Sequence, residues 1–325
     1  MRFIKSLSWR DYIKKNLMKK LAFLFLFGVT TMLSAQTDSD GIKMSKNNFC
    51  GGLTYSYSYW DHYWEGTFRR DNANIGTVST SSISVMGAYG VTDRLNIIFS
   101  LPYIKTNSSA GTLKGLQDVQ DFSLFLKWLV YKKNADPSNY SIYAVLGGST
   151  PTNNYIADFL PMSIGLKSST INVRLICDYQ FKHFFVTASG NYIYRFNIRI
   201  DRTAYYTDKM IYSNEVYMPN AFSSKLGLGY RNGELIIEGN VDSWNTLGGF
   251  DIRKNDMPFP SNKMNMTRAG INLKVPVNKV NGLSIIANSF YTLQGRNVGQ
   301  SLSGTIGVFY IFTLKRNAQT PEISG

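Results

Sequence analysis

The histidines are the first residues to test for chemistry, because a hydrolytic site needs a nucleophile within hydrogen-bond reach of a general base. The sequence has two, His62 and His183. Two phenylalanines follow His183 and no serine lies within two residues of it, so we expect a solvated turn residue. His62 lies in the aromatic stretch 60–65, which is either a loop for an aromatic ligand or glycan, or part of an aromatic girdle at a membrane interface. We favour the girdle.

The acidic residues Glu234, Glu238 and Asp242 are the best candidates for paired carboxylate catalysis. A spacing of four residues places neighbouring carboxylates on one face of a strand, but about 13 Å apart at roughly 3.3 Å per residue. Glycosidase pairs lie closer together than this. Lys225 falls on the strand before them, so a ladder of ion pairs is the simpler interpretation.

The two cysteines, Cys50 and Cys177, belong to no Cys-x-x-Cys or Cys/His group, which argues against a zinc site. They fall on strands far apart in the expected fold, so we predict that both thiols stay free. No phosphate-binding loop, nucleophile elbow or dinucleotide motif stands between a strand and a helix. The sequence therefore predicts no enzyme, no cofactor and no metal.

The N-terminus reads as an export signal. Lys19 and Lys20 precede an apolar run that is too short to span a bilayer, and Leu33-Ser34-Ala35 resembles a cleavage site. We expect a signal peptide over 1–35, with translation starting at Met1 or at Met18; a buried helix is the alternative. Residues 1–35 carry a net charge of +6, so only +8 remains on the rest, without a basic stripe. Nucleic-acid binding is not expected.

After residue 35 the apolar residues recur with period two, as in β-strands. In 121–130, Phe122, Leu124, Leu126, Trp128 and Val130 alternate with polar residues. No apolar run of 18 residues follows the leader, which excludes helical spans. An exported membrane protein must then be a closed barrel.

The connections between the expected strands alternate in length, which favours an outer-membrane barrel over a soluble sandwich. We predict an all-β fold, a closed antiparallel transmembrane β-barrel of about twelve strands spanning 49–312, with short periplasmic turns and long outer loops. A short periplasmic segment, 36–48, precedes the barrel, and a disordered tail, 313–325, follows it. The expected strands are 49–60, 77–90, 94–105, 118–131, 140–149, 168–179, 184–196, 221–231, 234–244, 266–276, 283–293 and 301–312.

One hairpin carries a strong local marker, Asn232-Gly233. This pair suits a two-residue type I′ turn, which would place Arg231 opposite Glu234. The same alternation assigns charged residues of both signs to the barrel interior. The candidates that face the lumen are Asp121, Lys127, Arg174, Asp178, Lys225, Glu238, Asp242, Arg268 and Lys274.

The stretch 305–312, TIGVFYIF, resembles the signal by which the outer-membrane assembly machinery recognises its substrates. Gly307, Tyr310 and Phe312 are its candidate residues. The chain continues past the final aromatic residue, where many such proteins end.

Three further stretches carry a resemblance to a known family: Gly90-Val91-Thr92-Asp93-Arg94-Leu95, Leu101-Pro102-Tyr103 and Asp118-Val119-Gln120-Asp121. They are similar to the outer-membrane barrels of the MetA-pathway of phenol degradation family. The resemblance covers about 50–312 and implies a barrel that passes small hydrophobic or aromatic compounds. It implies no catalytic residues.

The sequence thus predicts a protein of the outer membrane of a Gram-negative bacterium. We expect passive passage of small solutes, aromatic or amphiphilic ones among them. The expected partners are outer-membrane lipid, the assembly machinery and the solutes. The alternative is a plugged structural barrel whose loops bind a partner; apolar anchors such as those in 257–260 would mark a loop that folds into it.

Overall fold

A computed structural model describes residues 37–254 and 256–314. The expected signal peptide, 1–35, and the tail from residue 315 lie outside the described residues. No described helix is long and apolar enough to cross a membrane.

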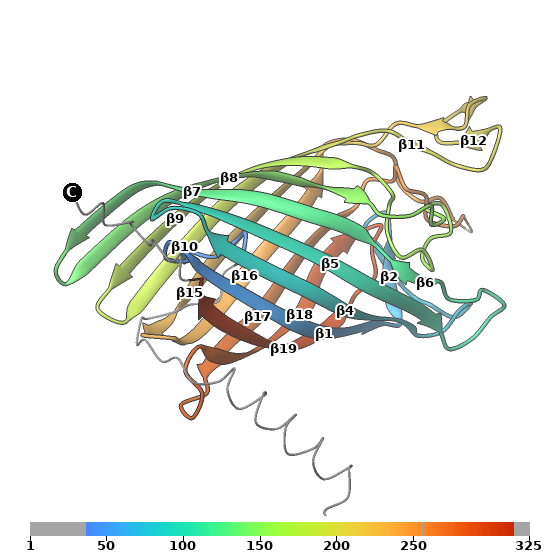
Figure 1. Ribbon diagram of the computed structural model, residues 1–325. Coiled ribbons are helices and arrows are strands. Elements are labelled where there is room, and N and C mark those ends of the chain that lie inside the picture. The colour runs from blue at the N-terminus through green and yellow to red at the C-terminus, as the bar shows by residue number, and fades with distance from the viewer. Residues whose placement is uncertain (1–36, 255, 315–325) are drawn as a thin grey trace, which may run out of the picture. The chain divides into compact units, whose positions relative to one another are not determined.

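The described chain forms a closed antiparallel β-barrel of twelve long strands (Figure 1). Each strand pairs with its neighbours in sequence, and the first strand, β1, also pairs with the last, β19, so the sheet has no open edge. The barrel strands are β1 (Asn48–Trp60), β4 (Val78–Gly90), β5 (Leu95–Ser108), β7 (Asp121–Ala135), β8 (Ser138–Pro151), β9 (Thr170–Phe181), β10 (Phe184–Arg195), β15 (Ala221–Asn232), β16 (Leu235–Thr246), β17 (Asn265–Pro276), β18 (Leu283–Arg296) and β19 (Leu302–Thr313).

The predicted fold class is confirmed, including the alternation of connections. One end of the barrel carries the short turns, and the other carries the long loops with their own small strands (Figure 1). These are β2 (His62–Glu65), β3 (Phe68–Asp71), β6 (Gln117–Val119), β11 (Ile198–Arg199), β12 (Tyr205–Tyr206), β13 (Met210–Ile211) and β14 (Glu215–Val216). We refer to these ends as the turn end and the loop end.

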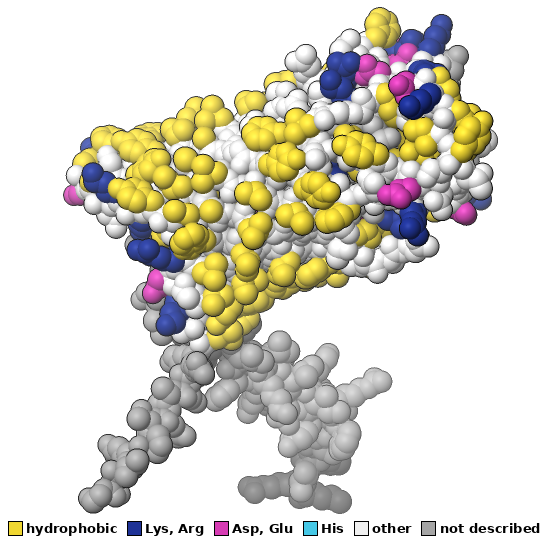
Figure 2. Space-filling model, turned by 90° about the horizontal axis from the view of Figure 1, so that it is seen from above, with side chains coloured by type: hydrophobic (Ala, Val, Ile, Leu, Met, Phe, Trp, Pro, Cys, Tyr) yellow, Lys and Arg dark blue, Asp and Glu magenta, His cyan; other side chains and the backbone are white. Residues whose placement is uncertain are grey.

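Apolar side chains cover the outer wall. On β7, Leu124, Leu126 and Trp128 are exposed while Lys127 between them is fully buried, as the alternation predicts. Figure 2 shows hydrophobic side chains spread over the wall and charged side chains gathered mainly at the two ends. Because the apolar face points outward and the polar face inward, the barrel suits a lipid surround rather than water. The protein has the fold of a transmembrane β-barrel.

Two local predictions are corrected by the structure. The connection expected over 132–139 is only Asp136-Pro137, because β7 and β8 continue their pairing from Tyr131–Ile142 to Ala135–Ser138. A bulge between Leu129 and Tyr131 interrupts the alternation there. The residues after the bulge are mostly polar, so the sequence shows no apolar alternation there, although their backbone still pairs.

The second correction concerns the hairpin between β15 and β16. Asn232 pairs with Leu235, so the loop is Gly233-Glu234 rather than Asn232-Gly233. Only Gly233 has a positive φ, of 59°, which fits a turn that needs glycine at its first central position. The register shifts by two residues, so every side chain keeps its predicted face.

The last strand also extends further than expected. Thr313 pairs with Asn48 and donates a hydrogen bond to its side chain at 2.9 Å. Leu314 still hydrogen-bonds to the carbonyl of Asn47. The expected tail of 313–325 therefore contributes its first residues to barrel closure.

Candidate solute pathway in the barrel lumen

A ladder of ion pairs lines the lumen on β15, β16 and β17. Asp242 lies opposite Lys225 on one side and opposite Arg268 on the other. Arg268 binds Asp242 through two nitrogens, each at 2.9 Å, and Lys225 reaches Glu238 at 2.7 Å. Each carboxylate lies beside a cation, so the wall carries both charges and little net charge.

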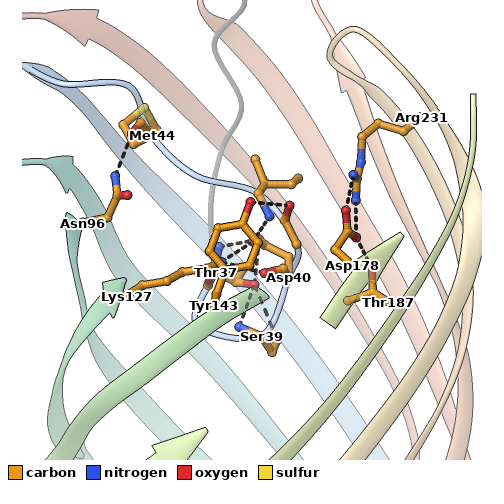
Figure 3. A network of polar contacts seen from close by, with 12 residues as sticks. Thr37, Ser39, Asp40, Met44, Asn96, Lys127, Tyr143, Asp178, Thr187 and Arg231 are labelled. Carbon is orange, nitrogen blue, oxygen red and sulfur yellow. Dashed lines mark hydrogen bonds and ion pairs between the residues drawn. The ribbon is translucent and has the colours of Figure 1, made fainter. Parts of the chain in front are cut away.

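A second ionic group lies towards the turn end. Asp178 on β9 accepts hydrogen bonds from Arg231 on β15, one of them at 3.0 Å, and from Thr187 on β10 (Figure 3). The Arg231 guanidinium also lies 4.1 Å from the ring centre of Phe185. Sequence reasoning missed Arg231, because it stands next to the predicted turn; its place on the same face as Lys225 is the signal that could have identified it.

The N-terminal segment 37–47 lies inside the barrel. Lys127, which is 0% exposed, donates hydrogen bonds to the carbonyls of Thr37 and Asp40 at 3.0 and 2.6 Å and to the Asp40 carboxylate at 2.7 Å (Figure 3). Its ammonium also lies 5.1 Å from the ring centre of Tyr143. A buried ammonium needs several acceptors, and this segment supplies them.

Three further contacts hold the same segment. Arg174 pairs with Asp38 at 3.1 Å, Tyr143 donates to the carbonyl of Gly41 at 3.1 Å, and Asn96 donates to that of Met44 at 2.9 Å. A side chain at position 41 would collide with Asp178, so only glycine allows this approach. The segment expected in the periplasm is thus packed against the inner wall, because the lumen offers cations that match Asp38 and Asp40.

Two of the candidate lumen residues differ from the rest. Asp121 lies near the loop end and accepts a hydrogen bond from Tyr155 of loop 152–169 at 2.6 Å. Lys274 is 5% exposed, and its ammonium has no hydrogen-bond partner among the described residues.

Three cavities follow the lumen, with volumes of about 340, 410 and 340 Å³, and Arg268 lines all three. The first lies against the N-terminal segment and the second reaches Arg174. The third, nearer the loop end, is lined mainly by hydroxyl groups. Its lining includes Ser56, Ser58, Thr80, Ser82, Ser303 and Thr305.

The outer loops pack on one another. Tyr205 stacks on Phe259 with ring centres 5.2 Å apart, within an apolar cluster that includes Ile198, Val216 and Met218. Phe259 of the proline-rich stretch 257–260 therefore anchors loop to loop. Arg296 and Asn297 donate hydrogen bonds to Asp251, and those from Arg296 hold the pKa of Asp251 below its ordinary value.

The residues considered first for chemistry are held in ordinary contacts. The imidazole of His62 lies between Asp61 and Asp71, at 2.7 and 2.9 Å, on the β2–β3 hairpin. His183 lies in the turn between β9 and β10 beside the ring of Tyr230. Both cysteines are free, and no cluster that could hold a metal is found among the described residues.

The candidate assembly residues lie on β19. The side chains of Tyr310 and Phe312 are exposed on the outer wall with their rings stacked 6.1 Å apart. Gly307 faces Thr54 of β1 so closely that a side chain there would collide with it. Recognition by the assembly machinery remains a prediction.

Comparison with solved structures supports the fold. The structure matches that of the COG4313 outer membrane channel from Pseudomonas putida F1 with a TM-score of 0.68, 15% sequence identity, and coverage of 86% of this chain and 100% of that one. The translocator domain of the autotransporter NalP from Neisseria meningitidis matches at a TM-score of 0.42 and 12% identity, with coverage of 93% and 96%. No family model and no curated protein matches the sequence. The resemblance to the phenol-degradation family therefore remains a prediction.

Proposed function

We propose that the barrel allows passive passage of small solutes, among them aromatic or amphiphilic molecules, and performs no chemistry. The observation that carries this proposal is the series of three cavities that share Arg268 within one lumen. Twelve strands enclose a lumen wider than eight-stranded barrels, which side chains fill, and narrower than 16–18-stranded porins. The long side chains of Lys225, Arg174 and Arg268 narrow it further, so flux should be slow.

The ion pairs argue for weak charge selectivity. A strongly selective pore presents one sign of charge to the solute. In this lumen Asp242 and Glu238 lie beside Arg268 and Lys225, so neither sign dominates. Small neutral molecules and small ions of both signs should therefore pass.

Swelling of liposomes that contain the purified protein tests the proposal. Small sugars, amino acids and phenolic compounds should enter faster than they enter protein-free vesicles. Replacement of Arg174 and Lys225 by Ala should enlarge the size limit. If no solute enters faster than in the protein-free control, passage through the lumen is excluded.

One observation favours a second candidate, a plugged barrel that acts through its outer loops. The N-terminal segment occupies part of the lumen and is bound to Lys127 and Arg174. A swelling assay that stays negative even after this segment is released would favour the plugged barrel over the channel.

A further inference from the structure

Lys274 is a buried cation of the lumen whose ammonium has no hydrogen-bond partner among the described residues. The carboxylates beside the first cavity are bound elsewhere: Asp40 to Lys127, Glu238 to Lys225, and Asp242 to Arg268. Glu234, at the nearby turn, accepts a hydrogen bond from Ser284 at 3.2 Å. Among the described residues, none accepts a hydrogen bond from the ammonium of Lys274.

An unpaired buried ammonium is costly, because burial removes the water that would otherwise solvate it. Lys274 nevertheless lines the first cavity, of about 340 Å³. Ligand sites in proteins have volumes of roughly 300–1,000 Å³, so this cavity is large enough for a small molecule. An anion that enters it would meet a cation with free hydrogen-bond donors.

The same cavity has an apolar side. Ile236 and Ile286 are the register partners of Lys274 on β16 and β18, and both line the cavity together with Phe290 and Phe309. Ile42 of the N-terminal segment lines it as well. An inorganic anion would leave these side chains without contact, whereas a molecule with an apolar body would cover them.

We propose that this cavity is a binding site for a small aromatic monocarboxylate, with the carboxylate accepting hydrogen bonds from Lys274 and the ring against Ile236, Ile286 and Phe290. The site adds a solute class to the proposed passage of small solutes. Its role in transport rests on that proposed function. Binding itself can be measured without transport.

The test is calorimetric titration of the detergent-solubilised protein with benzoate, benzyl alcohol and acetate in a chloride-free buffer. Benzoate should bind roughly tenfold more tightly than benzyl alcohol, since a hydrogen bond to a charged group contributes more than a neutral one. Benzoate should also bind more tightly than acetate, which lacks the ring. Equal affinity for benzoate and benzyl alcohol would exclude a role for the charge, and equal affinity for benzoate and acetate would exclude the apolar side.

Variants assign the effect to the lysine. Lys274→Met keeps the length of the side chain and should weaken benzoate binding roughly tenfold while leaving benzyl alcohol unchanged. Lys274→Arg should restore much of the benzoate affinity. Lys279→Met makes the same change of charge at an exposed turn residue and should bind benzoate as the unmodified protein does. Equal benzoate affinity in Lys274→Met and Lys279→Met would overturn the proposal.

The swelling assay separates this proposal from the proposed function. If sugars enter the liposomes but benzoate does not bind, the site is wrong and the channel stands. If benzoate binds through Lys274 but no solute enters, the site stands and the passage of solutes is wrong.

Discussion

The two sides of the lumen are built from different chemistry. The side formed by β7 to β17 carries charged residues, from Lys127 to Lys274, and binds the N-terminal segment. The side formed by β1, β4 and β19 carries small hydroxyl groups, such as Ser56 and Thr305. Long charged side chains fill space in the lumen and form ion pairs. Serine and threonine are smaller, so they leave space, and their hydroxyl groups can still form hydrogen bonds with polar solutes.

This difference suggests a division of work. The charged side binds Asp38 and Asp40 of the segment 37–47, while Met44 of the same segment packs on apolar residues of β1, β4 and β19 at the turn end. The hydroxyl side lines the third cavity, in the half of the barrel near the loop end. Four experiments, in order of expected effect, test this division.

The largest effect, on the amount of folded protein, should come from β19, whose inner face belongs to the hydroxyl side and whose outer face carries two aromatic residues. Replacing both Tyr310 and Phe312 by Ala removes two aromatic side chains from the lipid-facing wall of the closing strand, each worth about 1.5–3 kcal/mol of burial. Barrel closure depends on β19, so the amount of heat-modifiable, folded protein in outer-membrane fractions should fall sharply. Deletion of 315–325, which spares Thr313, should cause a much smaller loss. Equal losses would mean that the tail carries the assembly signal.

The next largest effect should follow from Asp40→Asn on the charged side. Removing one partner of a buried ion pair costs about 3–5 kcal/mol, and Lys127 is fully buried. The segment 37–47 should leave the wall, and single-channel conductance in a planar bilayer should rise. Ser39→Ala is the matched control, because the hydroxyl of Ser39 hydrogen-bonds only to Thr37 among the described residues. Unchanged conductance in Asp40→Asn would show that the segment does not limit the path.

A moderate effect is expected for the pair of Lys225 and Glu238. Lys225→Met leaves Glu238 without its cation, and Glu238→Gln leaves Lys225 without its anion, so each single variant should lower the free energy of unfolding. The double variant should recover part of the loss, with a coupling of about 0.5–3 kcal/mol. Urea unfolding of the protein in lipid measures it. Strict additivity would mean that the two groups are solvated independently.

The smallest effect should come from the hydroxyl side. Ser56 and Thr305 share a hydrogen bond at 2.9 Å, and replacing them by Ala and Val should cost about 0.5–1.5 kcal/mol. Conductance should stay close to that of the unmodified protein, since no bound segment is released. A change as large as that of Asp40→Asn would remove the distinction between the two sides.

The faces of the strands could be read from the sequence, because a period of two places alternate residues on opposite sides whatever the partner strand. This explains why Leu124 and Trp128 lie outside while Lys127 lies inside, and why the hairpin at Gly233 could shift by two residues without changing any face. The alternation of short turns and long loops indicated a barrel. Without an apolar helix, a closed barrel is the fold that satisfies all backbone hydrogen bonds within a membrane.

The sequence by itself therefore determined the fold class, and it predicted the side of the wall for nine charged residues. The pairing of Lys225 with the acidic residues of the next strand could be predicted from the sequence, but only the tertiary structure decided which charges meet between segments far apart in the chain. Asp38 and Asp40 reach Arg174 and Lys127 across more than 80 residues of chain, and Arg231 reaches Asp178 across 53. Such pairs depend on barrel curvature and on the path of the N-terminal segment, neither of which leaves a periodic signal in the sequence. For the same reason Lys274, one of nine charged candidates by pattern, was distinguished as unpaired only by the folded lumen.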